Sequence, residues 1–230
     1  MELVYRIFCS SVGKKYITAL SGVGLILFLI GHLSGNLLIY LGPDKLNAYG
    51  HFLQTSKHIL WPARIGMLLL ITLHIWTAVQ CWFENQAARP IGYLNGIPYG
   101  ASWPSRYTMV TGLTLAAFIL YHLLHYTVMV QALNPTGKNF HDLVDAHNRH
   151  DVYTMMLTGF SNGWVVLLYL VAMGFLAVHL WHGVSALFQT LGLRTLRNQA
   201  SVEWVAMIFS AILFMGYVSI PLSIWLGILK

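Results

Sequence analysis

The stretch ILYHLLHYTV, from Ile119 to Val128, places two histidines inside one of the most apolar parts of the chain. The nearest formally charged residues are Arg106 and Lys138, so the pair lies within a long uncharged window. A helix that crosses a bilayer needs about 20 mainly apolar residues, and this window can supply them. The stretch therefore predicts a transmembrane helix that carries two ionisable side chains.

The composition of the 230-residue chain indicates an integral membrane protein. Hydrophobic residues make up 57% of it and charged residues only 9%, against about 25% charged residues in an ordinary soluble domain. The mean hydropathy is +0.64. The formal net charge of +6 would suggest a nucleic-acid partner for a soluble protein, but here the cations lie between apolar windows. Cations at such positions anchor helix ends and set topology, so we expect membrane lipid as a partner and no nucleic acid.

Five uncharged windows divide the chain into five predicted transmembrane helices. Lipid requires that every backbone polar group be satisfied internally, which favours helices. We predict an all-α integral membrane protein in which the five helices form one bundle, a single membrane domain over residues 1–230. The predicted helices cover approximately residues 16–41, 63–85, 106–131, 163–191 and 203–228.

The remaining segments give weaker indications. The lysines and arginines of the loops slightly favour a cytoplasmic N-terminus. We also predict that this multi-pass protein lies in the inner (cytoplasmic) membrane of the cell. Cys9 and Cys81 are too few to hold an iron–sulfur cluster. The run FHDLVDAHNRHD, residues 140–151, could mimic a metal site, but we interpret it as a short interfacial helix.

Six of the eleven histidines fall within the first four predicted helices. A single histidine on an apolar helix is most often a packing residue, yet an ionisable residue inside a membrane is a functional candidate. Four successive helices each carry at least one, and imidazole suits iron, copper, nickel and zinc. The six residues are His32, His74, His122, His125, His179 and His182.

The depth of these histidines in the membrane divides them into two levels. At 1.5 Å per residue, His32 and His122 lie about 25 Å from the inner surface, and His74 and His179 about 15–20 Å from it. A zinc ion needs three or four ligands at one point, which two depths do not provide. Two six-coordinate haems fit, because each porphyrin supplies four nitrogens and the protein two axial imidazoles. Such haems have no open iron position, so they carry electrons.

Each H-x-x-H motif supplies two imidazoles on one side of a helix, where an axial position needs one. We predict that His122 and His179 are ligands. His125 and His182 then lie nearby, where they bond a haem propionate or the backbone, assist a quinone, or only fill the bundle as polar residues. The residues alone leave these roles open.

Four stretches resemble the cytochrome b membrane-anchor subunit of succinate:quinone oxidoreductases, specifically the five-helix, two-haem class that includes fumarate reductase anchors. The resemblance implies that His32 and His122 hold the distal haem b and that His74 and His179 hold the proximal one, in agreement with the depths. In the third helix, His122 rather than His125 is taken as the ligand because of its distance from Thr111–Gly112. The stretches are KKYITALSGVGLILFLIGHLSGN (14–36), LLLITLHIW (68–76), TGLTLAAFILYH (111–122) and VHLWHGVSALFQTLG (178–192).

The resemblance also implies the partners and the path of the electrons. Succinate would be oxidised on a flavoprotein subunit, and an iron–sulfur subunit would pass electrons through both haems to or from a membrane quinone, typically menaquinone, as in respiratory complex II of the tricarboxylic acid cycle. The chain has no dinucleotide fingerprint, so we expect no catalytic, succinate-oxidising site on it. The partner subunits are expected to dock near residues 87–103 and 192–202. Whether the complex forms a higher oligomer is open.

The quinone site is expected among protonatable groups, because reduction of a quinone takes up two protons. Inner candidates are Glu84, Trp103 and Arg106. Outer candidates are Asp44, Lys45, His51 and His58, together with His141, His147 and His150.

Other functions are compatible with parts of this pattern. A di-haem anchor of another quinone-linked dehydrogenase or hydrogenase would differ in the partner that co-purifies. A haem-handling transporter would require a solvent-facing, tryptophan-rich loop. A third alternative is a helical channel or transporter without a cofactor, which a colourless purified protein would favour.

Overall fold

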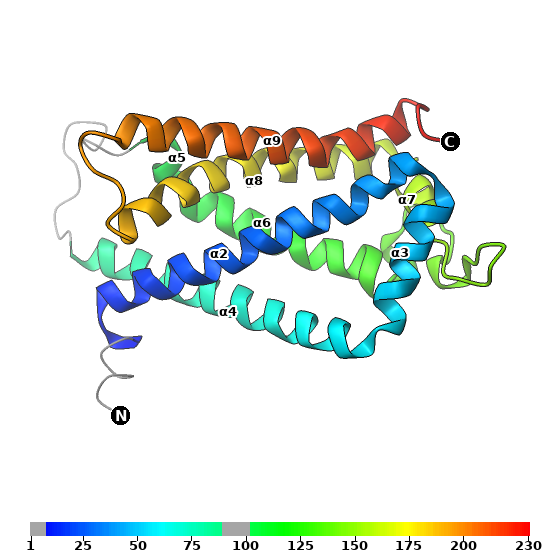
Figure 1. Cartoon of the computed structure of the whole chain (residues 1–230), viewed down its shortest axis with the longest axis horizontal. Coiled ribbons are helices and arrows are strands. Elements are labelled where there is room, and N and C mark those ends of the chain that lie inside the picture. The colour runs from blue at the N-terminus through cyan, green and yellow to red at the C-terminus, as the bar shows by residue number, and fades with distance from the viewer. Residues whose placement is uncertain (1–7, 89–101) are drawn as a thin grey trace. The chain divides into compact units, whose positions relative to one another are not determined.

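The computed structural model describes residues 8–88 and 102–230. Within these ranges the regular structure is helical, and the only β-type contact is an isolated bridge between Val144 and His150. Figure 1 labels the helices in chain order. The all-α class predicted from the sequence is confirmed.

Five helical segments are long and apolar enough to cross a membrane, so the chain is a multi-pass membrane protein. The first consists of α2 (Ser11–Asn36) and the tighter turn η1 (Leu37–Leu41), and the third of α6 (Thr108–His122) and the wider, π-helical turn η2 (Leu123–Thr127). The other three are α4 (Lys57–Ala87), α8 (Gly163–Thr190) and α9 (Gln199–Trp225).

The observed helix ends differ from the predicted ones where charged residues lie inside a helix. The first helix begins at Ser11 rather than near residue 16, because Lys14 is part of its first turns and pairs with Glu84 of α4. The second begins at Lys57 and contains Pro62. The third leaves the regular α-helix at His122. A π-helical turn of this kind is frequent at functional sites.

Shorter elements connect the long helices. After Gly42, whose φ of +96° favours glycine, Pro43 opens α3 (Pro43–Thr55). The remaining short elements are α5 (Trp103–Arg106), η3 (Gln131–Leu133), η4 (Phe140–Asp142) and α7 (Val152–Gly159).

The interfacial helix predicted over residues 140–151 is wrong. Only η4 is helical there, and an irregular loop follows it. The Asp145 carboxylate accepts hydrogen bonds from the backbone amides of His147 and Arg149, both at 2.9 Å. Asn148 adopts a φ of +59°. A side chain that binds its own backbone in this way offers the chain an alternative to a helix.

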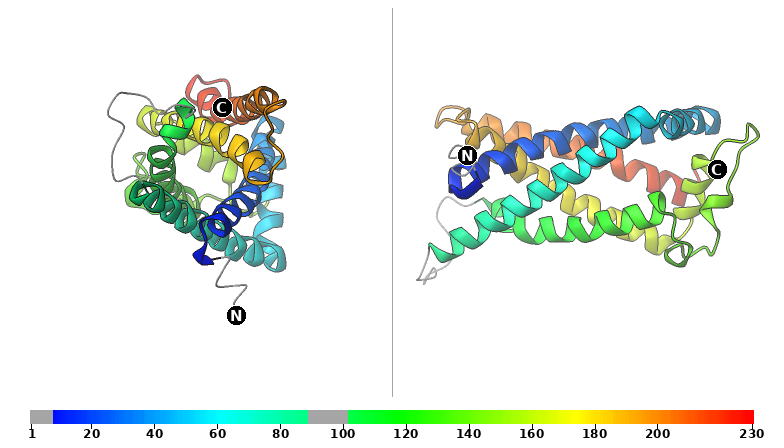
Figure 2. Two further views of the ribbon diagram at one scale, coloured as in Figure 1. Left: turned by 90° about the vertical axis from the view of Figure 1, so that its left-hand side faces the viewer. Right: turned by 90° about the horizontal axis from the view of Figure 1, so that it is seen from below.

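Figure 2 shows the ribbon from two further directions. The chain forms two compact units, and each long helix contributes residues to both. The first unit contains the described residues of Met1–Phe28, Ile65–Gly112 and Val178–Ser210. The second contains Leu29–Arg64, Leu113–Ala177 and Ala211–Lys230.

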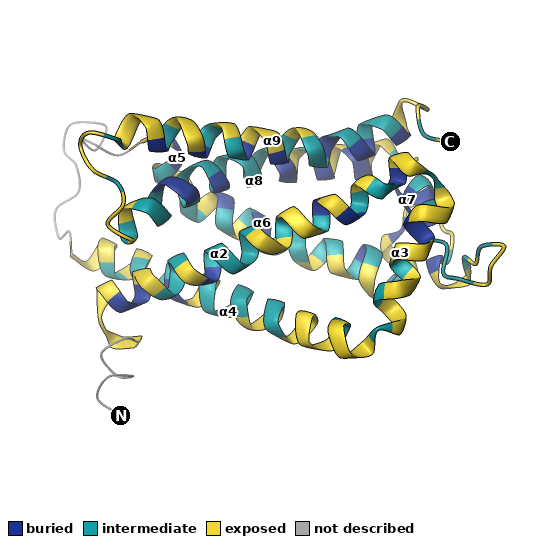
Figure 3. Cartoon of the chain, viewed as in Figure 1, coloured by how far each residue is buried: buried dark blue, intermediate teal, exposed yellow. Residues whose placement is uncertain are grey.

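The core of the second unit is apolar and includes one polar aromatic residue that bears on the site. Ile39, Phe160, Val165 and Ile220 are buried together with Tyr169. Figure 3 shows exposed residues in yellow along the long helices, and many of these residues are large and apolar. Exposed leucines there include Leu20, Leu27 and Leu68. Lipid, not water, is the natural environment of such a surface.

Candidate functional site

The first unit brings His74 of α4 and His179 of α8 together. Their ring centroids are 6.3 Å apart and their planes form an angle of 66°. Nδ1 of His74 lies 3.0 Å from the backbone carbonyl oxygen of Thr18 and 3.3 Å from Oγ of Ser21. A carbonyl oxygen can only accept, so Nδ1 carries the proton and Nε2 of His74 keeps its lone pair.

The same reasoning assigns the tautomer of His179. Its Nδ1 lies 3.1 Å from Oγ1 of Thr111, and that hydroxyl donates its hydrogen to the carbonyl of Thr108 at 3.0 Å. Thr111 must therefore accept from the N–H of His179, which leaves Nε2 as a lone-pair donor. Both imidazoles of the first unit thus have the form that binds a metal through Nε2.

Two glycines allow these rings to approach the neighbouring helix. A Cβ atom on Gly22 of α2 would lie 3.4 Å from Cε1 of His74, and one on Gly112 of α6 would lie 3.4 Å from Cε1 of His179. Both distances are ordinary van der Waals contacts, so the rings pack directly against these two positions of the neighbouring helices.

The second unit brings His32 of α2 and His122 of α6 together. Their ring centroids are 5.8 Å apart, with an angle of 83° between the planes. The side-chain nitrogen of Asn36 donates to the carbonyl of His32 at 2.9 Å and lies 3.2 Å from Nε2 of the same residue. Because that amide nitrogen is a donor, Nε2 of His32 is an acceptor, and Asn36 would have to turn away before this lone pair could bind a metal.

His125 lies beside this pair but is not part of it. Its side chain is fully buried, and its Nδ1 is 3.4 Å from the hydroxyl of Tyr169, which also lies 3.1 Å from Nδ1 of His122. In the described part of the chain, neither Nε2 of His125 nor the hydroxyl of Tyr126 has a hydrogen-bond partner. The π-helical turn after His122 places His125 in this aromatic cluster.

The two pairs fit the axial positions of two haems. Two metal–nitrogen bonds of about 2 Å, together with the distance from each nitrogen to its ring centre, separate the ring centroids by roughly 6 Å. The observed separations are 6.3 and 5.8 Å. Among residues 8–88 and 102–230, no three His, Cys, Asp or Glu side chains converge as a cage for a bare metal ion would require. The donor set is thus two imidazoles per site.

The inner quinone candidates lie in the first unit, where two of them are exposed. The Glu84 carboxylate pairs with Lys14 and accepts a hydrogen bond from Ser11, so it is already engaged within the protein. Trp103 and Arg106 are exposed on α5.

The outer quinone candidates lie in the second unit. Asp44 binds Nη2 of Arg149 at 2.8 Å, and this hydrogen bond lowers the pKa of the Asp44 carboxyl. Nε2 of His141 lies 3.1 Å from the backbone oxygen of Val128. Nε2 of His150 is buried and has no partner among the described residues. The others, Lys45, His51, His58 and His147, are exposed.

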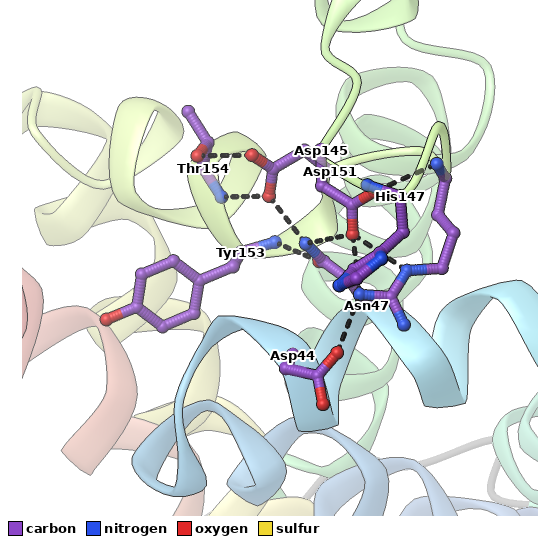
Figure 4. Close-up of polar contacts among 8 residues, drawn as sticks. Asp44, Asn47, Asp145, His147, Asp151, Tyr153 and Thr154 are labelled. Atoms are coloured by element: carbon purple, nitrogen blue, oxygen red, sulfur yellow. Dashed lines mark hydrogen bonds and ion pairs between the residues drawn. The ribbon is translucent and has the colours of Figure 1, made fainter.

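A polar network holds the loop that contains several of these residues (Figure 4). Asn47 of α3 is almost fully buried and donates to Asp151 at 2.9 Å, and it accepts from the amide of Tyr153 at 3.0 Å. Nε of Arg149 donates to Asp145 at 2.8 Å. The acidic groups are paired within the protein, so this cluster is a structural connection between α3, the loop and α7.

Sequence reasoning did not single out Tyr169, Thr18, Ser21, Thr111 or Asn36. The only sign of these partners in the sequence is the presence of threonine and serine on apolar helices. Apart from the contact of Asn36 with His32, each contact with a histidine joins residues that are far apart in the chain. Comparisons of the chain with protein-family models, with curated proteins and with solved structures found no match.

Proposed function

We propose that the chain is the di-haem cytochrome b membrane anchor of a succinate:quinone oxidoreductase. In this proposal electrons pass from an iron–sulfur subunit through two haems b to or from a membrane quinone, menaquinone in particular. The observation that carries the proposal is that two imidazole pairs, 6.3 and 5.8 Å apart, lie on membrane-spanning helices. Hydrogen bonds at Nδ1 leave Nε2 as a lone-pair donor in His74 and His179, whereas Nε2 of His32 accepts from the amide of Asn36.

His74 and His179 would hold one haem and His32 and His122 the other. When bound, a haem with two axial imidazoles supplies reversible one-electron chemistry. The chain's own groups orient the ligands: Thr18 and Ser21 hold His74, Thr111 holds His179, and Tyr169 holds His122. Partners of this type fix the ring orientation and increase the basicity of a ligating histidine.

The surroundings of the turn after α8 support a partner that docks there. Gly192, with a φ of +73°, ends the helix, and Leu193 and Leu196 are 55% and 91% exposed. Such leucines, next to Arg194 and Arg197, suit a protein surface better than water. We propose that the iron–sulfur and flavoprotein subunits bind at this end, on the cytoplasmic side of the inner membrane. The other expected docking segment covers residues 87–103, and its residues 89–101 lie outside the described residues.

Substitution of the ligands tests the proposal. Replacing His32, His74, His122 or His179 by alanine should remove one of two haems, as counted by a pyridine haemochrome assay on the purified complex. His125→Ala and His182→Ala should retain both, and His51→Ala, at an exposed position on α3, is the control. Two haems in all four ligand variants would refute the assignment. A co-purifying subunit other than the expected flavoprotein would indicate a different quinone-linked dehydrogenase or hydrogenase.

A further inference from the structure

A partly open cavity of about 130 Å³ lies in the first unit, between α5, α8, the turn after α8 and the start of α9. Its lining is almost entirely polar and includes Ser102, His182, Gln189, Arg194 and Glu203. A polar hollow on a chain whose long helices are apolar needs a ligand or water to satisfy its groups.

One wall of the cavity is a rigid, electrically neutral network. Arg194 pairs with Glu203 at 3.0 Å and donates to Oγ of Ser185 at 3.0 Å. Ser185 in turn donates to Glu203 at 2.8 Å, and Nε1 of Trp181 binds the other carboxylate oxygen at 3.2 Å. Since the two charges compensate each other, the wall favours neither an anion nor a cation. A neutral ligand fits it best.

Three other lining groups are available to such a ligand. Neither the imidazole of His182, nor the amide of Gln189, nor the hydroxyl of Ser102 forms a hydrogen bond with any described residue. These groups can all donate a hydrogen bond to a carbonyl oxygen. The cavity thus offers several donors to a small, neutral molecule that carries carbonyl groups.

The cavity lies beside one imidazole pair and next to exposed aromatic side chains. His182 follows His179 by three residues on α8, so the two side chains are neighbours on the helix surface. Trp103, 51% exposed, lies in the chain between Ser102 and Ser105, which both line the cavity, and its ring is 5.4 Å from that of Tyr107. Exposed Trp and Tyr of this kind lie at the membrane interface, where a lipid-soluble molecule would enter.

We infer that this cavity binds the headgroup of a membrane quinone, with His182 and Gln189 as hydrogen-bond donors to its carbonyl oxygens. This inference rests on the proposed function, and it chooses, among the roles that the sequence left open for His182, contact with a quinone. A headgroup seated there would lie next to His179 and could exchange electrons with the haem that His74 and His179 would hold.

The test uses the complex purified from the membrane and the probe 2,3-dimethyl-1,4-naphthoquinone. Ala186 lines the cavity, so Ala186→Leu should fill part of it, whereas Ala200→Leu makes the same change at an exposed position of α9. His182→Ala removes one donor and adds no bulk. We expect the Kd of the probe, measured by titration calorimetry, to rise about tenfold in Ala186→Leu and in His182→Ala, and to stay unchanged in Ala200→Leu.

Haem content separates this inference from the proposed function. If the wild-type complex contains two haems and both cavity variants bind the probe with the wild-type Kd, the inference is overturned and the proposed function stands. A wild-type complex that binds no probe overturns the inference as well. If the complex lacks haem, the proposed function fails, and the Kd comparison still decides whether the cavity binds a quinone.

Discussion

The hydroxyl of Tyr169 lies 3.1 Å from Nδ1 of His122 and 3.4 Å from Nδ1 of His125. A phenol has one hydrogen, so it can donate to only one of the two rings. His122 can bind iron through Nε2 when its Nδ1–H donates to Tyr169. Tyr169 then donates to His125, whose proton must lie on the buried Nε2. The three side chains therefore form one hydrogen-bonded chain, and ligation of iron by His122 would fix its direction.

Tyr169→Phe should weaken haem binding at the pair His32 and His122. Loss of the phenol removes the acceptor that orients the ligand, and the loss of such a partner typically lowers metal affinity by about 10–100-fold. Haem content after dialysis against a haem acceptor, together with the pyridine haemochrome count, measures the change. Tyr121→Phe is the control, because Tyr121 packs 6.2 Å from Tyr169 between ring centroids but forms no hydrogen bond with a described residue. Equal haem retention in the two variants would contradict the prediction.

Thr111→Val should have the corresponding effect on the pair His74 and His179. Valine has nearly the shape of threonine but cannot accept the Nδ1–H of His179, so haem affinity at this site should fall by about 10–100-fold. Thr108→Val is the matched control, because the hydroxyl of Thr108 binds the carbonyl of Pro104 and not the histidine. Haem content per chain is the measurement. A Thr111→Val protein that retains both haems like the control would show that His179 does not depend on this hydrogen bond.

The angles between the imidazole planes predict the spectra of the two sites. They are 83° for His32 and His122 and 66° for His74 and His179. Nearly perpendicular axial rings leave two iron d orbitals close in energy, whereas parallel rings separate them. We therefore expect strongly anisotropic low-spin signals in the electron paramagnetic resonance spectrum of the oxidised protein, more so for the His32 site. Signals typical of parallel imidazoles would contradict these angles.

The five membrane-spanning helices could be predicted because lipid excludes charge, so uncharged windows mark them directly. Their ends could not, since Lys14 lies inside α2, where Glu84 of α4 neutralises it. The loop at Asp145 was mistaken for a helix because hydrogen bonds from a side chain to nearby backbone amides leave no periodic pattern.

The histidine pairs could be expected from the sequence because helix rise converts spacing into depth. The pairing of His32 with His122 and of His74 with His179 was expected, and these are the imidazoles that the structure places close together. The groups that orient them, such as Tyr169 and Thr111, depend on contacts between helices. The cavity beside His182 depends on the turn after α8 and on α9, which spacing along one helix cannot indicate.

The loop that follows η4 should become less ordered as the pH falls. Burial raises the pKa of the Asp145 carboxyl, but hydrogen bonds from Arg149 and from the amide of His147 outweigh it and bring the pKa to about 2. Burial lowers the pKa of His150 below its ordinary value. A neutral His150 therefore supports the loop at pH 7, and that support declines as the pH falls below about 6.5, where an unfolded histidine gains a proton. The contribution of ionised Asp145 is present above about pH 4 and is lost towards pH 2.

Hydrogen exchange measures this loosening. Protection of the amides from residue 145 to residue 154, corrected for the intrinsic effect of pH, should be highest near neutral pH and fall in two steps on acidification. Asp145→Asn should reduce protection already at pH 7, because its side chain no longer pairs with Arg149 as an anion. Asp142→Asn is the control, since the carboxylate of Asp142 is exposed and accepts from Asn139 at 2.8 Å. Protection that is independent of pH, or equal in the two variants, would show that Asp145 does not hold the loop.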